Sequence, residues 1–284
     1  MTGIVGGLLA ALLWGSSTVT DARATRIVGS IGVLGWSSIA GCTLTLPVAL
    51  LFAHDSSDVG ARGLVWLTVS SVAAVAAFAP FYRAVQLGPV PLVAGLGATE
   101  GGVAAAISFA TGERLPALTL LGLAIALGGM IVVLVSVRTP VPTGHGHPLE
   151  AGLLATLAAT LFGLSLFAGA RAIDHVPELW LPAGSRTFGT VLVALPLLFL
   201  GRLPPPGRFL RFTFYSALAQ SAGYFSFLVA AGSSGVSVPA VLASQASVVG
   251  MVISFLVLHE RLSRRQLAGI AALLTGVAIV AGTR

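Results

Sequence analysis

The sequence predicts an all-α integral membrane protein with ten transmembrane helices, arranged as two inverted five-helix repeats. Three observations lead to this prediction. Of the 284 residues, 56% are hydrophobic and only 8% are charged, with a mean hydropathy of +0.99, whereas about a quarter of the residues of a soluble domain are charged. Apolar segments long enough to cross a bilayer recur along the chain. The second half also repeats the first. This composition excludes a soluble enzyme or a soluble binding domain.

The ten spans are located by their length. A helix crosses the roughly 30 Å hydrocarbon core with about 20 apolar residues. Reading between charges and turn residues, we expect spans at 3–22, 32–53, 63–86, 89–110, 117–137, 149–173, 178–200, 209–231, 236–258 and 265–283. The first break is the charged segment 21–26, and the two halves are joined at 140–148.

An internal repeat organises these spans. A Glu-Arg-Leu triplet at 113–115 recurs 147 residues later at 260–262. The same shift aligns ordered glycines of the two halves, namely Gly122 with Gly269 and Gly129 with Gly276. Because each unit holds an odd number of spans, the two units have opposite orientations in the membrane. We therefore predict one repeat at 1–139, a linker at 140–148 and a second repeat at 149–284.

Several kinds of chemistry are excluded by what the sequence lacks. There is no lysine, and therefore no Walker A phosphate loop and no Schiff-base lysine. One cysteine, Cys42, allows no internal disulfide and no cysteine metal cluster. The histidines lie at span ends or in loops, so the Gly-Ser-Ser-Gly segment at 232–235, which fits an intramembrane serine protease, has no base at mid-span. We expect no metal, no cofactor and no enzymatic activity.

The net charge of +6 does not indicate a nucleic-acid partner, because the arginines are scattered at the ends of spans, where they suit the headgroups of the lipid bilayer. An even number of spans places both termini on one side. Four arginines lie on that side, Arg62, Arg114, Arg171 and Arg284, and all others except Arg186 lie opposite. The positive-inside rule alone would therefore place the termini outside.

Two charged residues lie well inside predicted spans, Glu100 and Arg186. Exposing either to lipid costs about 2.5–3.5 kcal/mol on insertion scales, so each is expected to face a partner or water. A carboxylate suits an ammonium group and a guanidinium suits a carboxylate, so together they could bind the two ends of an amino-acid zwitterion. Alternatively, the two residues pair with each other, or Arg186 extends to the interface.

Further polar and aromatic residues complete the candidate substrate-binding set. Trp14 and Tyr82 lie near span ends, and Gln220, Tyr224 and Gln245 lie deeper, where buried amides and phenols need partners. Glu100 could also carry a coupling proton, because burial disfavours the charged form of a carboxyl group.

The order of short motifs resembles that of the drug/metabolite transporter superfamily, in its ten-helix branch with two EamA domains. The motifs are Leu-Leu-Trp-Gly-Ser-Ser at 12–17, Phe-Tyr-Arg-Ala-Val at 81–85, Gly-Glu-Arg-Leu at 112–115 and its counterpart His-Glu-Arg-Leu at 259–262. The resemblance spans nearly the whole chain. It implies a secondary carrier in the inner (plasma) membrane with cytoplasmic termini, similar to amino-acid exporters.

We therefore expect a transporter that exports small organic metabolites, amino acids first, by alternating access around a cavity between the repeats. A nucleotide-sugar or drug carrier of the same fold is the alternative, and a passive channel or an intramembrane protease are weaker ones. A channel should repeat its polar lining. At a shift of 147, however, Glu100 pairs with Ser247 and Ala98 with Gln245, and this asymmetry favours a specific binding site.

Overall fold

The computed structural model describes residues 2–53, 60–87, 93, 96–135, 148–246, 248–250, 252–253 and 264–282. All regular secondary structure in these residues is helical. Five of the described helices are long and apolar enough to cross a membrane, and shorter apolar helices accompany them. The predicted all-α membrane fold is thereby confirmed.

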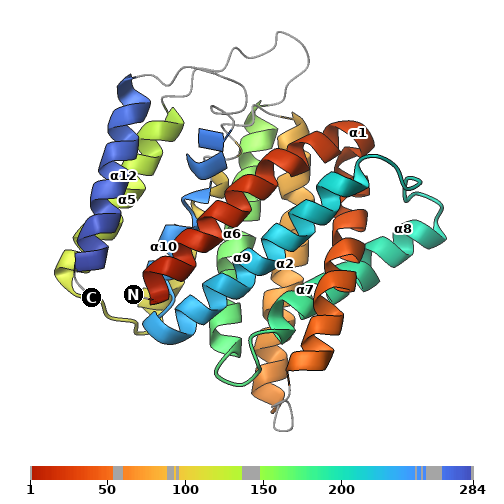
Figure 1. Ribbon diagram of the computed structural model, residues 1–284, viewed down its shortest axis with the longest axis horizontal. Helices are drawn as coiled ribbons and strands as arrows, with labels where there is room; N and C mark the ends of the chain where they lie inside the picture. The colour runs from red at the N-terminus through yellow and green to blue at the C-terminus, as the bar shows by residue number, and fades with distance from the viewer. Residues whose placement is uncertain are drawn as a thin grey trace.

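The first two predicted spans form one element, α1 (Thr2–Phe52), which is interrupted at Gly29. Gly29 has φ 75° and ψ 169°, a backbone conformation that favours glycine, and the chain reverses direction there (Figure 1). The expected break at Asp21–Arg26 is therefore wrong, because the helix continues through these charged residues. A helix tolerates a charged side chain that finds a partner, whereas a positive φ ends it.

The remaining helices follow the predicted order. They are α2 (Ala61–Leu87), α4 (Glu100–Ala110), α5 (Ala117–Val135), α6 (Pro148–Ala172), α7 (Trp180–Gly189), the π-helical turn η2 (Thr190–Ala194), α8 (Leu195–Phe199), α9 (Leu210–Ser234), α10 (Ser237–Ala243) and α12 (Arg264–Gly282). Glycines with positive φ follow three of the predicted spans, at Gly112, Gly201 and Gly235. The linker residues 140–147 lie outside the described residues.

The inverted arrangement of the repeats is visible where α5 packs on α12, its copy (Figure 1). A Cβ atom at Gly122 would lie 2.9 Å from the Gly276 carbonyl oxygen, and one at Gly129 would lie 2.6 Å from that of Gly269. The repeat shift of 147 residues relates Gly122 to Gly269 and Gly129 to Gly276, so it converts each of these two contacts into the other. Because the earlier residue of one helix meets the later residue of the other, the two equivalent helices run antiparallel, as inverted repeats require.

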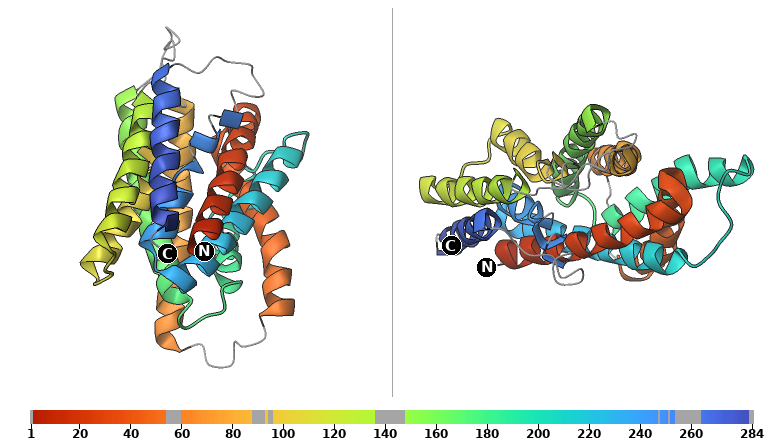
Figure 2. Two further views of the ribbon diagram at one scale, coloured as in Figure 1. Left: turned by 60° about the vertical axis from the view of Figure 1, so that its left-hand side comes forward. Right: turned by 90° about the horizontal axis from the view of Figure 1, so that it is seen from above.

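The other helix pairs obey the same exchange. Helix α1 packs on α9 and α10, while α6, the copy of the first part of α1, packs on α2 and α4. In the repeat, α9 is the copy of α2, and α10 belongs to the copy of the span that contains α4. The contact of α1 with α9 therefore corresponds to that of α6 with α2, and the contact of α1 with α10 corresponds to that of α6 with α4. The start of α1 and the end of α12 lie at the same end of the bundle (Figures 1 and 2), which places both ends of the described chain on one side.

One contact between the repeats involves the first of the duplicated acidic residues. The carboxylate of Glu113 accepts hydrogen bonds from the Ser237 hydroxyl (2.8 Å) and backbone N–H (3.3 Å), and from the Ser108 hydroxyl. Glu113 therefore caps the first turn of α10, a helix of the other repeat. Its copy, Glu260, lies outside the described residues.

The α5–α12 contact yields a test with a built-in control. Gly129→Ala should lower the free energy of unfolding by about 1–3 kcal/mol, because the added methyl group meets the backbone of α12 at 2.5–2.6 Å. Gly128→Ala should leave stability unchanged or slightly raised, since nothing lies within 4 Å of that position. Thermal unfolding in detergent compares the two. Equal effects would contradict this packing.

Candidate functional site

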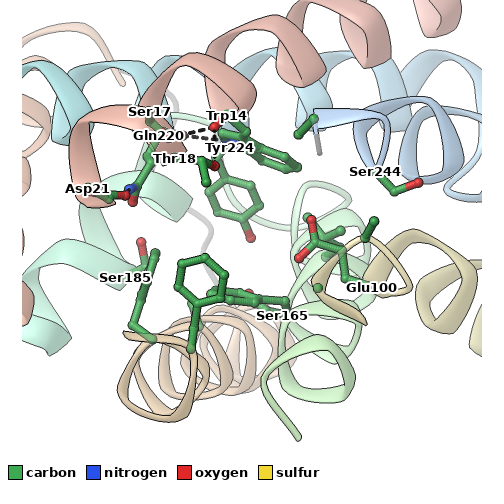
Figure 3. A pocket seen from close by; sticks show the side chains of 18 of the residues that line it. Trp14, Ser17, Thr18, Asp21, Glu100, Ser165, Ser185, Gln220, Tyr224 and Ser244 are labelled. Atoms are coloured by element: carbon green, nitrogen blue, oxygen red, sulfur yellow. Dashed lines mark hydrogen bonds between the residues drawn. The ribbon is translucent and has the colours of Figure 1, made fainter. Parts of the chain in front are cut away.

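A cavity of about 150 Å³ lies between helices of both repeats, and a cavity of this size can hold a benzene-sized ligand. Its lining includes aromatic side chains, hydroxyl groups and three charged residues (Figure 3). The polar and aromatic lining residues are Trp14, Ser17, Thr18, Asp21, Phe78, Phe81, Glu100, Phe162, Ser165, Ser185, Arg186, Gln220, Tyr224 and Ser244.

Equivalent residues of the two repeats line the cavity. Trp14, Ser17 and Thr18 of α1 line it, and so do the residues 148 positions later in α6, which are Phe162, Ser165 and Leu166. Ala74 and Phe78 of α2 line it together with Gln220 and Tyr224 of α9, 146 positions later. Equivalent surfaces of the two halves therefore face the same space, as in transporters built from inverted repeats.

Two helices are interrupted beside the cavity at equivalent positions. Tight turns at 98–99 and 244–245 break the helical pattern. The Thr99 N–H donates to Leu96 (3.1 Å), and the Gln245 N–H donates to Leu242 (3.1 Å), 146 positions later. The shift is therefore 146 here, which pairs Glu100 with Ala246 and corrects the pairing with Ser247 made from the sequence. The shift of 147 was derived from glycines elsewhere in the two repeats. It could not reveal that the segments leading to these two turns differ in length by one residue.

Asp21, Gln220 and Arg186 form a hydrogen-bonded chain at one side of the cavity. The Gln220 side-chain N–H donates to Asp21 (2.8 Å), and its oxygen accepts from Arg186 Nη2 (2.7 Å). Ser216 donates to the other Asp21 oxygen (2.6 Å). All four side chains are buried. The amide thus joins a carboxylate to a guanidinium. Buried charges are stable only when they are paired and hydrogen-bonded, and here the two opposite charges are paired through the amide.

Asp21 is the functional candidate that sequence reasoning missed, because its charge was taken as the end of the first span. A signal was present in the spacing. Trp14, Ser17 and Asp21 follow one another at i, i+3 and i+7, which places all three on one face of a helix. The structure shows that face lining the cavity.

Arg186 points into the protein and does not extend to the membrane interface. It is 7% exposed, donates to Ser37 (3.2 Å) as well as to Gln220, and lies over the Phe78 ring at 5.5 Å from its centre. A Cβ atom at Gly41 would lie 2.7 Å from Arg186 Cγ, so glycine makes room for this side chain. The alternative in which Arg186 reaches the interface is therefore excluded.

A second, uncharged group lies where α2 meets α6. The Ser70 hydroxyl lies 2.6 Å from the Tyr224 hydroxyl and donates to the Ser165 carbonyl oxygen (2.9 Å). A shift of 146 carries Ser70 to Ser216, so this group is the counterpart of the Asp21 network. Gly169 stands where the repeat places Asp21, and a Cβ atom there would meet the Tyr224 hydroxyl. The two halves thus share a framework and differ in charge.

Glu100 begins α4 and faces the cavity on the side away from Asp21 (Figure 3). In the part of the chain that the structure describes, no hydrogen bond or ion pair joins its carboxyl group to another side chain, Arg186 included. The alternative in which Glu100 and Arg186 form a pair is thereby excluded. As far as the described residues go, Glu100 therefore presents an unpartnered carboxyl group to the cavity.

Comparison with known proteins assigns the family. The sequence profile of the EamA-like transporter family matches this chain twice, at residues 1–135 and 150–282. The chain belongs to the EamA-like transporter family. Its membership confirms the resemblance to the drug/metabolite transporter superfamily, and the two matches correspond to the two halves of the structure.

A solved structure, described simply as the crystal structure of a protein, has the same fold. It superposes with a TM-score of 0.78 over 99% of this chain and 96% of its own, at 18% sequence identity. Among curated proteins, none matches this sequence.

Of the remaining candidates of this EamA-like transporter, Trp14 lines the cavity, and Tyr82 and Gln245 lie outside its lining. The Trp14 ring N–H donates to the backbone carbonyl oxygen of Gln220 (3.1 Å). Tyr82 is 1% exposed and stacks on Phe78, outside the lining, and the Gln245 side-chain N–H is used by the Val241 carbonyl oxygen (3.0 Å). The described residues contain no group of three or more potential metal ligands.

The bridging role of Gln220 predicts a stability effect. Gln220→Ala removes the partner of two buried charges and should lower the free energy of unfolding by about 1–3 kcal/mol. Gln86→Ala is the matched control, because Gln86 is exposed and accepts only a surface hydrogen bond from Ser30 (3.2 Å). Thermal unfolding in detergent measures both. A Gln220→Ala protein as stable as the control would show that the bridge contributes nothing.

Proposed function

We propose that this protein is a secondary transporter that exports small amino compounds, with amino acids as the first class, by alternating access around the cavity between its repeats. The observation that carries the proposal is the position of the cavity, which is lined by equivalent residues of both halves and contains the free carboxyl group of Glu100. In inverted repeats each half can adopt the conformation of the other, so such a site can open to either side in turn.

The lining favours an amino compound over the other substrates considered. The carboxyl group of Glu100 suits an ammonium group, which amino acids and amines share. A nucleotide sugar carries two phosphate groups, which need an excess of positive charge. Two carboxyl groups and one guanidinium line this cavity, which argues against such a substrate. Glu100 is also the residue best placed to carry a coupling proton.

For location, we propose the plasma (inner) membrane, with both termini on the cytoplasmic side. The two chain ends lie at the same end of the bundle, and the resemblance to exporters of this superfamily implies that this side is cytoplasmic, although the arginine count alone favours the reverse. Fusions of a topology reporter after residues 138 and 284 should give opposite signals, with the cytoplasmic signal at residue 284.

A transport assay with a mutant tests the proposal. Purified protein in liposomes loaded with radiolabelled amino acids and amines should show saturable transport of at least one of them. Glu100→Gln should fold with normal yield, because no described side chain is a partner of this carboxyl group, and should lose at least about 90% of the transport rate.

Two comparisons sharpen this assay. Glu150→Gln changes an exposed carboxyl group in the first turn of α6 and should transport normally. A double variant that exchanges the charges of Glu100 and Arg186 should recover nothing, since the two residues form no pair. Full transport by a well-folded Glu100→Gln protein would refute the proposed role of Glu100.

A further inference from the structure

We infer that the cavity selects amino compounds with a net positive charge, namely an ammonium group on an aromatic or apolar body, over zwitterionic amino acids of the same size. This inference rests on the proposed function and specifies the substrate class of the same site. It follows from which charges of the cavity are already paired.

The positive charge in the cavity is already balanced by protein groups. Arg186 donates to Gln220 and Ser37, and Gln220 connects it to Asp21. Asp21 and Arg186 attract each other electrostatically across this bridge. A substrate carboxylate that approached Arg186 would compete with Asp21 for the same guanidinium and meet a carboxylate of like charge. The gain from binding a carboxylate there is therefore small.

The negative charge of Glu100 is not balanced by any described side chain. Its place in the first turn of α4 is one that favours a carboxylate, since the N-terminus of a helix carries partial positive charge. When Glu100 has released its proton and Asp21 and Arg186 are charged, the three charged lining residues sum to −1. A ligand with one positive charge brings the site to neutrality, whereas a zwitterion leaves it charged.

The surroundings of Glu100 suit the body of such a ligand. Trp14, Phe78, Phe81, Phe162 and Tyr224 line the same cavity. Aromatic faces attract cations through their quadrupoles and also pack against apolar groups. At the position equivalent to Glu100, the second repeat has the uncharged Ala246. Aromatic walls with one free carboxyl group are the chemistry that recognises an organic amine.

A matched ligand series tests the inference. The ligands are phenylalanine, phenylalanine amide and N-acetylphenylalanine, at a pH where the amine of the amide is protonated. They share one body and carry net charges of zero, plus one and minus one. Equilibrium binding to the protein in lipid nanodiscs should give the amide a Kd at least about tenfold lower than that of phenylalanine, equivalent to about 1.4 kcal/mol. The N-acetyl compound should bind weakest.

Two variants should change this ranking by different routes. Glu100→Gln removes the free charge and should abolish the preference for the amide. Asp21→Asn leaves Arg186 unbalanced opposite an intact Glu100, so affinity for phenylalanine should rise and that for the amide should fall. Glu150→Gln should leave the ranking unchanged. A general structural defect would weaken all ligands together and would not reverse their order, so Asp21→Asn keeps the test decisive even if Glu100→Gln folds poorly.

The outcomes separate the two proposals. If wild-type protein binds phenylalanine as tightly as the amide, or if Asp21→Asn keeps the wild-type ranking, the charge inference is wrong while amino-compound transport can still hold. If none of the ligands binds and no amino compound is transported in liposomes, the proposed function fails as well.

Discussion

The structure depends on the Gln220 side chain, which holds a buried carboxylate and a buried guanidinium together within the bilayer. A charged side chain in the hydrocarbon region is costly unless it has a partner. An amide has both a donor and an acceptor, and Gln220 uses them to join Asp21 to Arg186. This bridge ties α1, α7 and α9 together on one side of the cavity. It also leaves Glu100 as the unpaired charge among the described lining residues, and the substrate proposals depend on that difference.

The two repeats share a backbone plan but differ in the chemistry they bring to it. Close helix contacts, interrupted helices and cavity-facing positions recur at shifts of 146 to 148. The charges do not recur, because Asp21 has Gly169 as its counterpart and Glu100 has Ala246. Symmetry of the backbone suits a site that opens to either side, whereas the side chains make the two halves of the lining chemically different. The same contrast argues against a channel, which would need its polar lining repeated along the path.

The sequence predicted the fold better than the site. Apolar length and the glycines repeated at 122, 129, 269 and 276 were enough for the helices and the inverted repeat, because bilayer thickness and close helix packing leave few alternatives. Glu100 and Arg186 could be chosen because charges within spans are rare. The sequence did not identify Asp21 as the partner of Arg186, because Asp21 lies near a span end, where charges are common. Only the tertiary contact with α9 distinguishes it from an interfacial residue.

The most direct test of this account is a structure of the protein with a bound substrate amine. The account predicts that the ammonium nitrogen lies within hydrogen-bond distance of the Glu100 carboxylate, with the body of the ligand against Trp14 and Phe162, and that the Asp21–Gln220–Arg186 chain stays intact. A ligand bound elsewhere would contradict the account, and so would one whose carboxylate displaces Gln220 from Arg186 while its ammonium group lies away from Glu100.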